Sequence, residues 1–580
     1  MIKAEKLSFG FSDRILYNNI NFELKPGRHC ALIGSNGTGK TTLADLIRCP
    51  ENYLFDGKLF RENVGRIGFV SQFANRERGQ GQTVFEYLSE DFNRLQEEID
   101  LVCQKMGEED DLESLLEQYQ ILLDESESVD AEHFEANIHR QLHLAELNDK
   151  AHLELSKLSG GEYKLVQVIR QMLRRPGLLI MDEPDVFLDF ENLNGLRDLI
   201  NAYAGTLLVI THSRFLLAHC FDQIWHLENT DLQEFDGNFS MYQYSLLQRK
   251  IDLQKAANTD AAEIQRVSDM VDRLRKEATE VIDPLRGRTL KGKASYLGRL
   301  MARQIKGPFV EIKQPDIKLP DVEENDEPAV LLEVRNYYLA FEKKLLEQVN
   351  FSIASHEKVA LVGPNGTGKT TLLRQIQKSD DPSFVFAPEA RLGFFSQIQE
   401  DMLDEGNTIY QEFYEIGFES PADVENHLAQ YCFQADTLDR KISCLSGGEK
   451  NLLQLAKLAA GEANLLILDE PSSHLDTYSQ IALEKAISAY QGAVLMVSHD
   501  FYTIVNCADR ILYVENGTIR PMSIRAFRKM IYKKHFSLEY LELEQKKKEL
   551  ETKIARCLVG GDCDTAQTLC DELGEVVEKM

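Results

Sequence analysis

Two kinds of apolar pattern alternate along this chain, and the same order appears in each half. Alternating apolar and polar positions in AEKLSFGF (from residue 4) and LLEVRNYYLAF (from residue 331) are typical of half-buried strands. Continuous apolar runs that follow a single polar residue, such as HCALI and KVALV, indicate strands that are buried on both faces. Helical periodicity follows in YKLVQVIRQML and KNLLQLAKLAA. Strands that alternate with helices predict an α/β fold with a mostly parallel sheet in each half.

Between the halves, the apolar spacing changes to that of a coiled coil. An outgoing seam takes steps of three and four residues from Ile264 to Ala278. Pro284 follows the end of this helix, and a short returning seam runs from Ala294 to Met301. The sequence therefore predicts an antiparallel helical hairpin, followed by an extended linker that is rich in proline and charge.

One insertion distinguishes the two halves. Three matched pairs are each separated by 287 residues: Ser159 and Ser446, Glu183 and Glu470, and His212 and His499. Gln72 and Gln397 are 325 residues apart, so the first half holds 38 extra residues between its glutamine and Ser159. These residues fall in an acidic, leucine-bearing stretch with helical spacing. We expect a helical arm at about 91–140.

A chain of 580 residues is long enough for several domains. The patterns above predict four parts: an α/β domain at 1–247, a helical hairpin linker at 248–327, a second α/β domain at 328–530, and a helical, coiled-coil tail at 531–580.

Each half also carries the same glycine-rich loop. GSNGTGKT at 34–41 returns as GPNGTGKT at 363–370. Glycines at these positions let backbone N–H groups surround phosphate oxygens at a helix N-terminus, and Lys40 and Lys369 are placed to reach the β- and γ-phosphates of ATP. The predicted ATP-binding residues are Gly34, Ser35, Asn36, Gly37, Thr38, Gly39, Lys40, Thr41 and Thr42, with Gly363, Pro364, Asn365, Gly366, Thr367, Gly368, Lys369, Thr370 and Thr371.

An acidic turn closes a buried strand in each half, as IMDEP at 180–184 and ILDEP at 467–471. We expect Mg²⁺ to be held by two pairs of residues, Thr41 with Asp182 and Thr370 with Asp469. The carboxylate that follows each aspartate can orient and deprotonate the water that attacks the γ-phosphate. The histidines would contact that phosphate, and the glutamines would sense Mg²⁺ and the water. The predicted catalytic residues are Glu183, Glu470, His212, His499, Gln72 and Gln397.

The motif LSGGE occurs at 158–162 and again at 445–449. Serine and glycine donors at a helix start form a second anion site, but a P-loop already encloses its own phosphates. The signature residues must therefore serve the ATP held by the other half. They are Ser159, Gly160, Gly161 and Glu162, with Ser446, Gly447, Gly448 and Glu449. Two composite sites are expected within one monomer, Lys40 with Ser446 and Lys369 with Ser159.

Taken together, these motifs resemble those of the F subfamily of ATP-binding cassette (ABC) proteins, over nearly the whole chain. The subfamily features are tandem cassettes without a membrane domain, a helical linker of 80 residues at 248–327, and EPSSHLD at 470–476, which is close to the usual EPTNHLD. The resemblance implies a cytoplasmic, Mg²⁺-dependent ATPase that closes on two ATPs. It also implies that Phe11 and Phe341 stack on adenine, although either ring could instead belong to the core.

The family resemblance further implies a ribosomal partner, with the linker hairpin directed toward the P-site tRNA and rRNA. The net charge of −29 argues against nucleic acid for the chain as a whole. Residues 286–306, however, contain seven basic side chains and no acidic one. We expect RNA contacts from six of them: Arg286, Arg288, Lys291, Lys293, Arg299 and Arg303.

The first half departs from the family pattern at two motifs. It reads EPDVFLD at 183–189 and THSRF at 211–215, where EPTNHLD and SHDRF are usual. Both segments lie at the expected interface between the cassettes. The two ATP sites are therefore expected to hydrolyse ATP at different rates.

Two other classes of protein share these ATPase motifs. A DNA-repair ATPase of the excision type would need zinc-binding CxxC pairs, and the ten cysteines include none. No run reaches the ~18 apolar residues of a membrane span, so a transporter role would require separate membrane subunits. The acidic arm and basic hairpin have no evident purpose in that case. Within the ribosomal reading, a translation factor and an antibiotic-protection factor share every motif named above.

Overall fold

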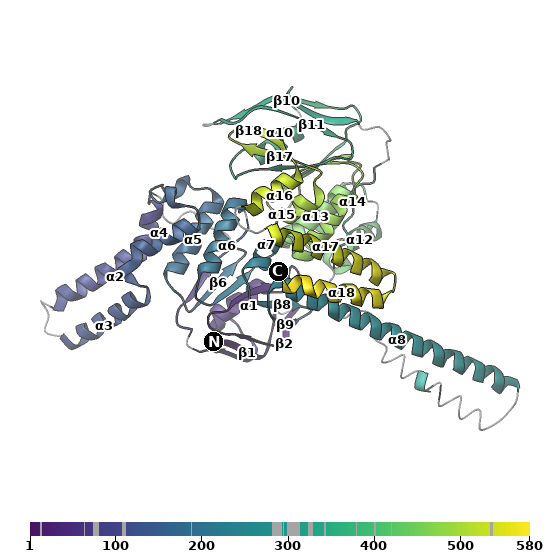
Figure 1. The fold of residues 1–580 in the computed structure, drawn as a ribbon, viewed down its shortest axis with the longest axis horizontal. Coiled ribbons are helices and arrows are strands. Elements are labelled where there is room, and N and C mark those ends of the chain that lie inside the picture. Colours follow the sequence, from purple (N-terminus) through teal and green to yellow (C-terminus); the bar gives the residue numbers. More distant parts are fainter. Residues whose placement is uncertain are drawn as a thin grey trace. The chain divides into compact units, whose positions relative to one another are not determined.

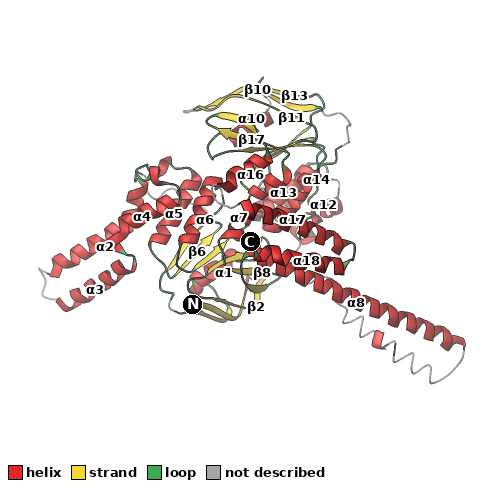
Figure 2. Cartoon of the chain, in the orientation of Figure 1, coloured by secondary structure: helices red, strands yellow, loops and turns green. Residues whose placement is uncertain are grey.

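The computed structural model describes residues 1–11, 14–62, 64–72, 81–106, 112–186, 188–280, 293, 295–297, 314–322, 329–341, 344–378, 380–398, 402–418, 420–533 and 538–580. They divide into two compact units. The first unit joins Met1–Asp236 to Lys313–Ile531 and contains both α/β domains. The second joins Gly237–Ile312 to Tyr532–Met580 and is helical (Figures 1 and 2).

The first α/β domain is built on a six-stranded sheet in the order β5-β6-β7-β3-β8-β9. Its strands pair in parallel except β8 with β9, which are antiparallel. The strands are β3 His29–Ile33, β5 Ile67–Val70, β6 Leu178–Asp182, β7 Leu207–Ile210, β8 Gln223–Glu228 and β9 Asp231–Asp236. A smaller antiparallel sheet, ordered β2-β1-β4, consists of β1 Ile2–Phe11, β2 Arg14–Leu24 and β4 Asp56–Arg61.

The second α/β domain repeats this plan. Its large sheet has the order β14-β15-β16-β12-β17-β18, again with an antiparallel last pair. The strands are β12 Lys358–Val362, β14 Leu392–Phe395, β15 Leu465–Asp469, β16 Ala493–Val497, β17 Arg510–Glu515 and β18 Thr518–Met522. The small sheet, ordered β11-β10-β13, contains β10 Val330–Ala340, β11 Lys344–Ala354 and β13 Phe384–Phe386.

Helices cover these sheets. In the first domain they are α1 Lys40–Arg48, α5 Gly160–Leu173, α6 Phe190–Ala202 and α7 Arg214–His219. In the second they are α10 Lys369–Lys378, α13 Gly447–Ala459, α14 Thr477–Ala489, α15 Phe501–Cys507 and α16 Ile524–Lys533. The central strands are apolar on both faces and fully buried, as the residues Leu32, Ile180 and Ile210 illustrate. Because neighbouring parallel strands end at the same edge of the sheet, the turns after β3, β6 and β7 meet there.

The 38 extra residues of the first half lie in a helical region. It contains α2 Val84–Met106, α3 Leu112–Ser128 and α4 Phe134–Leu144. In the described part of the corresponding segment, the α-helices of the second domain are α11 Ile409–Glu415 and α12 Pro421–Ala429. α2 has 23 residues and α11 has 7, so most of the insertion lies in the longer α2 and in α3, which pack against each other (Figure 1).

The helical unit combines the predicted linker with the predicted tail. α8 runs from Phe239 to Glu280, and α17 Leu538–Val559 and α18 Cys563–Glu578 pack together and against it. Their shared core consists of Ile251, Leu550, Ile554, Ala566, Cys570, Leu573, Val576 and Val577. Of the predicted returning helix, residues 295–297 are described as helical, and Tyr296 Oη donates a hydrogen bond to Glu263 Oε1 at 2.8 Å. None of the described helices contains a segment apolar and long enough to cross a bilayer.

The end of the linker lies on the second α/β domain. Residues 314–322 form neither helix nor strand. Tyr431 Oη donates to the carbonyl of Lys318 at 2.9 Å, and the N–H of Asp316 donates to the carbonyl of Gln430 at 2.7 Å. Ile317 is buried in this contact. The chain is therefore fixed to the second domain before β10 begins.

Candidate active site

Each P-loop connects a buried strand to a helix in the same way. β3 ends at Ile33 and α1 begins at Lys40, while β12 ends at Val362 and α10 begins at Lys369. Gly39 has φ 96°, and a Cβ there would lie 2.8 Å from Tyr17 Oη. Only glycine combines this backbone conformation with such a close approach. The resulting loop directs N–H groups toward a single anion-sized space at the helix start.

The two P-loop lysines are buried and point back into their own loops. Lys40 Nζ donates to the carbonyls of Gly34 and Ser35, each at 2.9 Å. Lys369 Nζ makes the matching bonds to Gly363 and Pro364 at 2.7 and 2.8 Å. A bound phosphate chain offers stronger, charged acceptors in the same place. The ammonium groups are thus already located where the predicted β- and γ-phosphates would be.

The predicted Mg²⁺ ligands also lie together in each half. Thr370 Oγ1 donates to Asp469 Oδ1 at 3.1 Å, and Thr41 hydrogen-bonds to Asp182. Among the described residues, Asp182 Oδ1 and Asp469 Oδ2 are buried and have no hydrogen-bond partner. Burial raises the pKa of both carboxyl groups, that of Asp469 to about 6. Unpaired buried oxygens beside a hydroxyl are a donor set that fits a hard cation. When bound, Mg²⁺ would neutralise negative charge on the phosphates.

The two predicted catalytic glutamates share an unusual backbone conformation. Glu183 has φ 45° and Glu470 has φ 52°, which is the left-handed region that non-glycine residues rarely adopt. Such strain is typically retained at functional sites, where it directs a side chain. Both residues directly follow the strand that carries the Mg²⁺ aspartate.

The groups that hold these glutamates differ. Glu183 Oε2 accepts a hydrogen bond from Gln72 Nε2 at 2.6 Å. Burial raises the pKa of Glu183, and the carboxylates of Asp185 and Asp182 raise it further. Thr211 Oγ1 donates to Asp185 Oδ1 at 2.7 Å, which fixes this extra carboxylate beside the site.

In the second half, a histidine rather than a glutamine contacts the glutamate. Glu470 Oε2 accepts a hydrogen bond from the N–H of His499 at 3.1 Å, and His499 Nε2 lies 3.5 Å from Glu470 Oε1. Burial raises the pKa of Glu470 and lowers that of His499 to about 3, so the imidazole is neutral. Gln397 lines the same cavity, but no hydrogen bond joins it to Glu470 among the described residues.

Both signature motifs form the N-terminus of a helix. Ser159 Oγ accepts from the N–H of Glu162 at 3.3 Å, and the Glu162 carboxylate accepts from the N–H of Ser159 at 2.8 Å. Ser446 and Glu449 form the same reciprocal capping pair at the start of α13. This pairing follows from the S-x-x-E spacing. It leaves the glycine N–H groups at the helix start directed outward.

The halves meet with each P-loop against a segment of the other half. Asn36 Nδ2 donates to the carbonyl of His474 at 2.9 Å, and the N–H of Asn36 donates to Asp476 Oδ2 at 3.2 Å. Asn36 also covers Gly448 of the second signature, where an added Cβ would lie 1.9 Å from Asn36 Nδ2. The structure thus brings the first P-loop to the second signature.

The second P-loop makes the reciprocal contact with the first half. The N–H of Asn365 donates to Asp189 Oδ2 at 3.0 Å, and Asp189 is the counterpart of Asp476. At Gly161, the counterpart of Gly448, the atoms nearest to an added Cβ belong to Asn192 and Leu188 of the same half. At Gly448, by contrast, the nearest atom belongs to Asn36 of the opposite P-loop.

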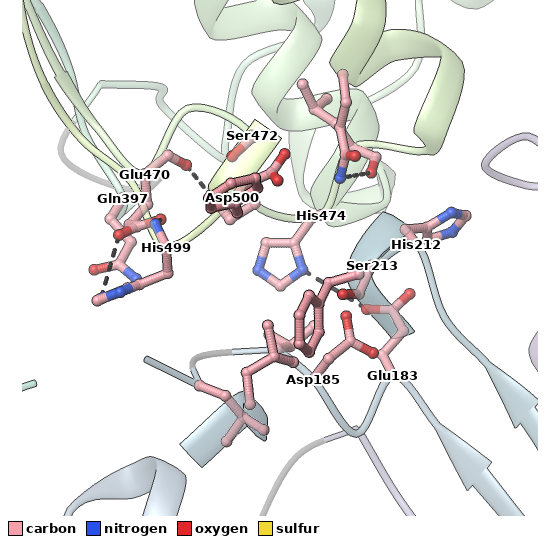
Figure 3. Close-up of a pocket in the computed structure, with 18 residues that line it drawn as sticks. Glu183, Asp185, His212, Ser213, Gln397, Glu470, Ser472, His474, His499 and Asp500 are labelled. Carbon is pink, nitrogen blue, oxygen red and sulfur yellow. Dashed lines mark hydrogen bonds and ion pairs between the residues drawn. The ribbon is translucent and has the colours of Figure 1, made fainter. Parts of the chain in front are cut away.

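Two cavities lie along this interface. One, of about 400 Å³, is lined by Ser35, Asn36 and Thr38 of the first P-loop and by Tyr431, Phe433 and Glu449 of the second half. The other, of about 120 Å³, lies between the predicted catalytic groups. Figure 3 shows Glu183, Asp185 and His212 on one side of it, Glu470 and His499 on the other, and His474 between them.

The remaining predicted site residues are the two aromatic rings, one histidine and the expected RNA contacts. The rings of Phe11 and Phe341 are 57% and 68% exposed, so neither belongs to the core and both are open to a ligand. His212, which follows β7 at the edge of the sheet, is buried. Of the expected RNA contacts, Lys293 is described as helical, whereas Arg286, Arg288, Lys291, Arg299 and Arg303 lie outside the described residues.

Sequence reasoning did not identify four residues that join the halves or the loops of the site. Asp189 and Asp476 each follow a predicted catalytic glutamate by six residues, and this repeat was a usable signal. Lys164 donates to the carbonyl of Gln72 at 2.9 Å and so holds the glutamine loop. Arg214 contacts Glu484 and, at 2.7 Å, Asp500 of the second half. The place of Arg214 is taken by Phe501 in the second half, so the repeat offered no signal for it.

Comparisons with known proteins agree with this arrangement. The ABC transporter family model matches residues 17–186 and 346–473. The chain is 30% identical to ABC transporter F family member 2 of Arabidopsis thaliana over 89% of its own length and 76% of that protein. It is 28% identical to the uncharacterized ABC transporter ATP-binding protein YfmM of Bacillus subtilis (strain 168), over 87% of its own length and 96% of that protein.

Among solved structures, the fold is similar to a chain in a model of ribosome-bound archaeal Pelota and ABCE1. The TM-score is 0.53 at 18% identity, over 91% of this chain and 80% of that one. Two family matches, two P-loops and two signatures within one chain describe a complete pair of cassettes. The chain therefore belongs to the ABC transporter family of ATPases, as a tandem-cassette protein of the F type.

Proposed function

We propose that the protein binds the ribosome in its ATP-bound state and alters the geometry of tRNA or the peptidyl-transferase centre, as a translation factor or as a protein that protects ribosomes from antibiotics. The observation that carries this proposal is the reciprocal contact of the P-loops, Asn36 with Asp476 and Asn365 with Asp189. ATP bound at such an interface draws the two cassettes together. Residues 237–312 are joined in sequence to both cassettes, so closure acts on both of their ends.

Similarity to other proteins and the distribution of charge along the chain support the ribosome as the partner. One structural neighbour is described as ribosome-bound. A relative named as an F family member is similar to this chain over 89% of its length. The basic stretch 286–306 lies between the two cassettes in sequence, whereas the chain as a whole carries a net charge of −29. Concentrated positive charge on an otherwise acidic protein confines phosphate binding to that segment. We therefore propose that this basic stretch contacts the phosphate backbone of P-site tRNA and rRNA.

For the reaction itself, we propose that a water oxygen forms a bond to the γ-phosphorus of ATP while the bond from phosphorus to the β–γ bridging oxygen breaks. ADP leaves with that electron pair. Glu183 or Glu470 takes the proton of the attacking water, with Gln72 and Gln397 beside the water and His212 and His499 toward the γ-phosphate. Lys40 and Lys369 stabilise charge on the departing oxygens. Mg²⁺ would be held by Thr41 with Asp182, and by Thr370 with Asp469.

The test uses the variant E183Q/E470Q, which removes both proposed bases and should hold the ATP-bound state. We expect this variant to sediment with ribosomes when ATP is present and to remain at the top of the gradient with ADP. Sedimentation through a sucrose gradient, followed by detection of the protein in each fraction, measures this. The matched control is K40A/K369A, which lacks the phosphate contacts and should not sediment with ATP. Absence of the E183Q/E470Q protein from the ribosome fractions with ATP would overturn the proposal and favour a DNA or membrane partner.

A further inference from the structure

The segment that follows β15 presents one histidine to the first cassette. His474 has φ 58°, an uncommon conformation for a residue with a side chain. Its carbonyl accepts the hydrogen bond from Asn36 Nδ2 at 2.9 Å. Its ring packs on Gly447, where an added Cβ would lie 3.3 Å from His474 Cγ. The P-loop of the first cassette and the signature of the second therefore fix the backbone and the ring together.

The ring of this histidine points at the glutamate of the other cassette. His474 Nδ1 lies 4.0 Å from Glu183 Oε2, and both side chains line the 120 Å³ cavity (Figure 3). The side chains are 19% and 18% exposed, so water screens their interaction only in part. Burial lowers the pKa of His474, which leaves a neutral ring that can donate one hydrogen bond.

The other site is arranged differently. Glu470 is held by the main chain and ring of His499, which belongs to the same cassette. In the first half, the residue that matches His474 in sequence is Phe187, whose side chain has no hydrogen-bonding group. The site of Lys40 therefore receives a histidine from the opposite cassette. The site of Lys369 has a phenylalanine at the matching sequence position.

We propose that His474 is a positioning residue that acts across the cassette interface on Glu183, orienting this carboxylate toward the attacking water at the site of Lys40. The proposal rests on the role of Glu183 as a base, given above. A separation of 4.0 Å is too long for a hydrogen bond, and contacts of this kind tighten when substrate closes the site. ATP bound at Lys40 also presses Asn36 and the His474 backbone together, so binding of ATP and alignment of Glu183 occur in one movement.

The experiment separates the two sites by single-turnover hydrolysis of ATP. In the E470Q background only Glu183 can act as base, and in the E183Q background only Glu470 can. We expect His474→Ala to lower the rate in the E470Q background about 10- to 100-fold, the range seen when a group that orients a metal ligand is removed. The rate in the E183Q background should change much less. His474→Gln should recover part of the rate, because its amide N–H can reach the same carboxylate.

Two further measurements distinguish positioning from structure. The affinity for a fluorescent ATP analogue should be the same with and without His474→Ala, since the ring does not contact the P-loop phosphate space. His133→Ala, which removes an exposed histidine from the first domain, serves as the control for general effects. Equal losses in both backgrounds, or a parallel loss of nucleotide affinity, would overturn the inference and assign His474 a packing role.

The same turnover rates test the role of His474 separately from the assignment of Glu183 as a base. If E470Q shows no turnover while E183Q does, Glu183 is not a working base, and both statements fail. If E470Q turns over ATP at a rate that His474→Ala leaves unchanged, Glu183 keeps its role and only the inference about His474 fails.

Discussion

At the scale of single residues, the two proposed bases have different surroundings. Glu183 is bound by Gln72 and lies beside the half-buried Asp185, whereas Glu470 is bound by His499. We expect each Glu→Gln change to lower turnover at its own site by ~10²–10⁴-fold. Of the two variants, E470Q should retain the faster turnover, because the first P-loop is the one already covered by the opposite signature. Single-turnover rates of the separate variants measure this.

The double variant E183Q/E470Q sets the background rate for this comparison. Equal residual rates in E183Q and E470Q would contradict the inequality of the sites. A faster rate in E183Q would keep the inequality but reverse its order, and would place the better site at Lys369.

At the scale of elements, the stability of α8 depends on the C-terminal helix pair. Ile554 of α17 is fully buried in the core shared with α8 and α18. We expect Ile554→Ala to destabilise this unit by about 2–5 kcal/mol, through lost burial and the cavity that remains. Thermal unfolding followed by calorimetry should show an earlier transition for the helical unit.

Val559, at the end of the same helix, offers the matched control because it is 92% exposed. Val559→Ala should change the unfolding free energy by less than about 0.5 kcal/mol. Similar shifts for the two variants would mean that α17 does not pack on α8 as described.

At the scale of the whole molecule, a buried arginine joins the two cassettes through ion pairs. Arg214 of the first cassette contacts Glu484 and Asp500 of the second, and its side chain is 10% exposed. Arg214→Met would leave the buried Glu484 and the half-buried Asp500 without their cation, and loss of a buried partner typically costs about 3–5 kcal/mol. We expect a lower midpoint in urea-induced unfolding and weaker association of the cassettes.

Arg335 is the comparison for this change. It pairs with Glu333 on the surface, and its side chain is 60% exposed. Arg335→Met should cost no more than about 1 kcal/mol, as surface pairs usually do. If Arg214→Met is no more damaging than Arg335→Met, the ion pair does not hold the interface.

Local motifs account for most of what could be predicted. The P-loop between β3 and α1 and the capping pair of Ser159 with Glu162 involve residues within a few positions of one another. Their spacing in sequence therefore determines their geometry. The buried strands were recognisable because a strand covered on both faces must be apolar throughout. The tandem family fold was predicted from these motifs and is shown by the family match.

Contacts between distant residues were not predictable in the same way. The tail and linker were expected as separate helical parts, yet Leu573 and Ile251 share one core. Each helix has an apolar stripe, but the stripe does not determine which other helix packs against it. The domain boundaries and the basic RNA-contact residues remain predictions, the latter mostly because they lie outside the described residues.

The sequence by itself determined the chemistry of this protein: two ATP-binding loops, two acidic strand ends and two signatures, each encoded by residues adjacent along the chain. The sequence also indicated that the two sites differ, at 183–189 and 211–215, and the tertiary structure decided which contacts make them different. Which loop covers Gly448, which histidine faces Glu183, and which carboxylates receive Arg214 depend on residues hundreds of positions apart. Such pairs leave no periodic pattern, because their proximity arises only when two complete domains pack together.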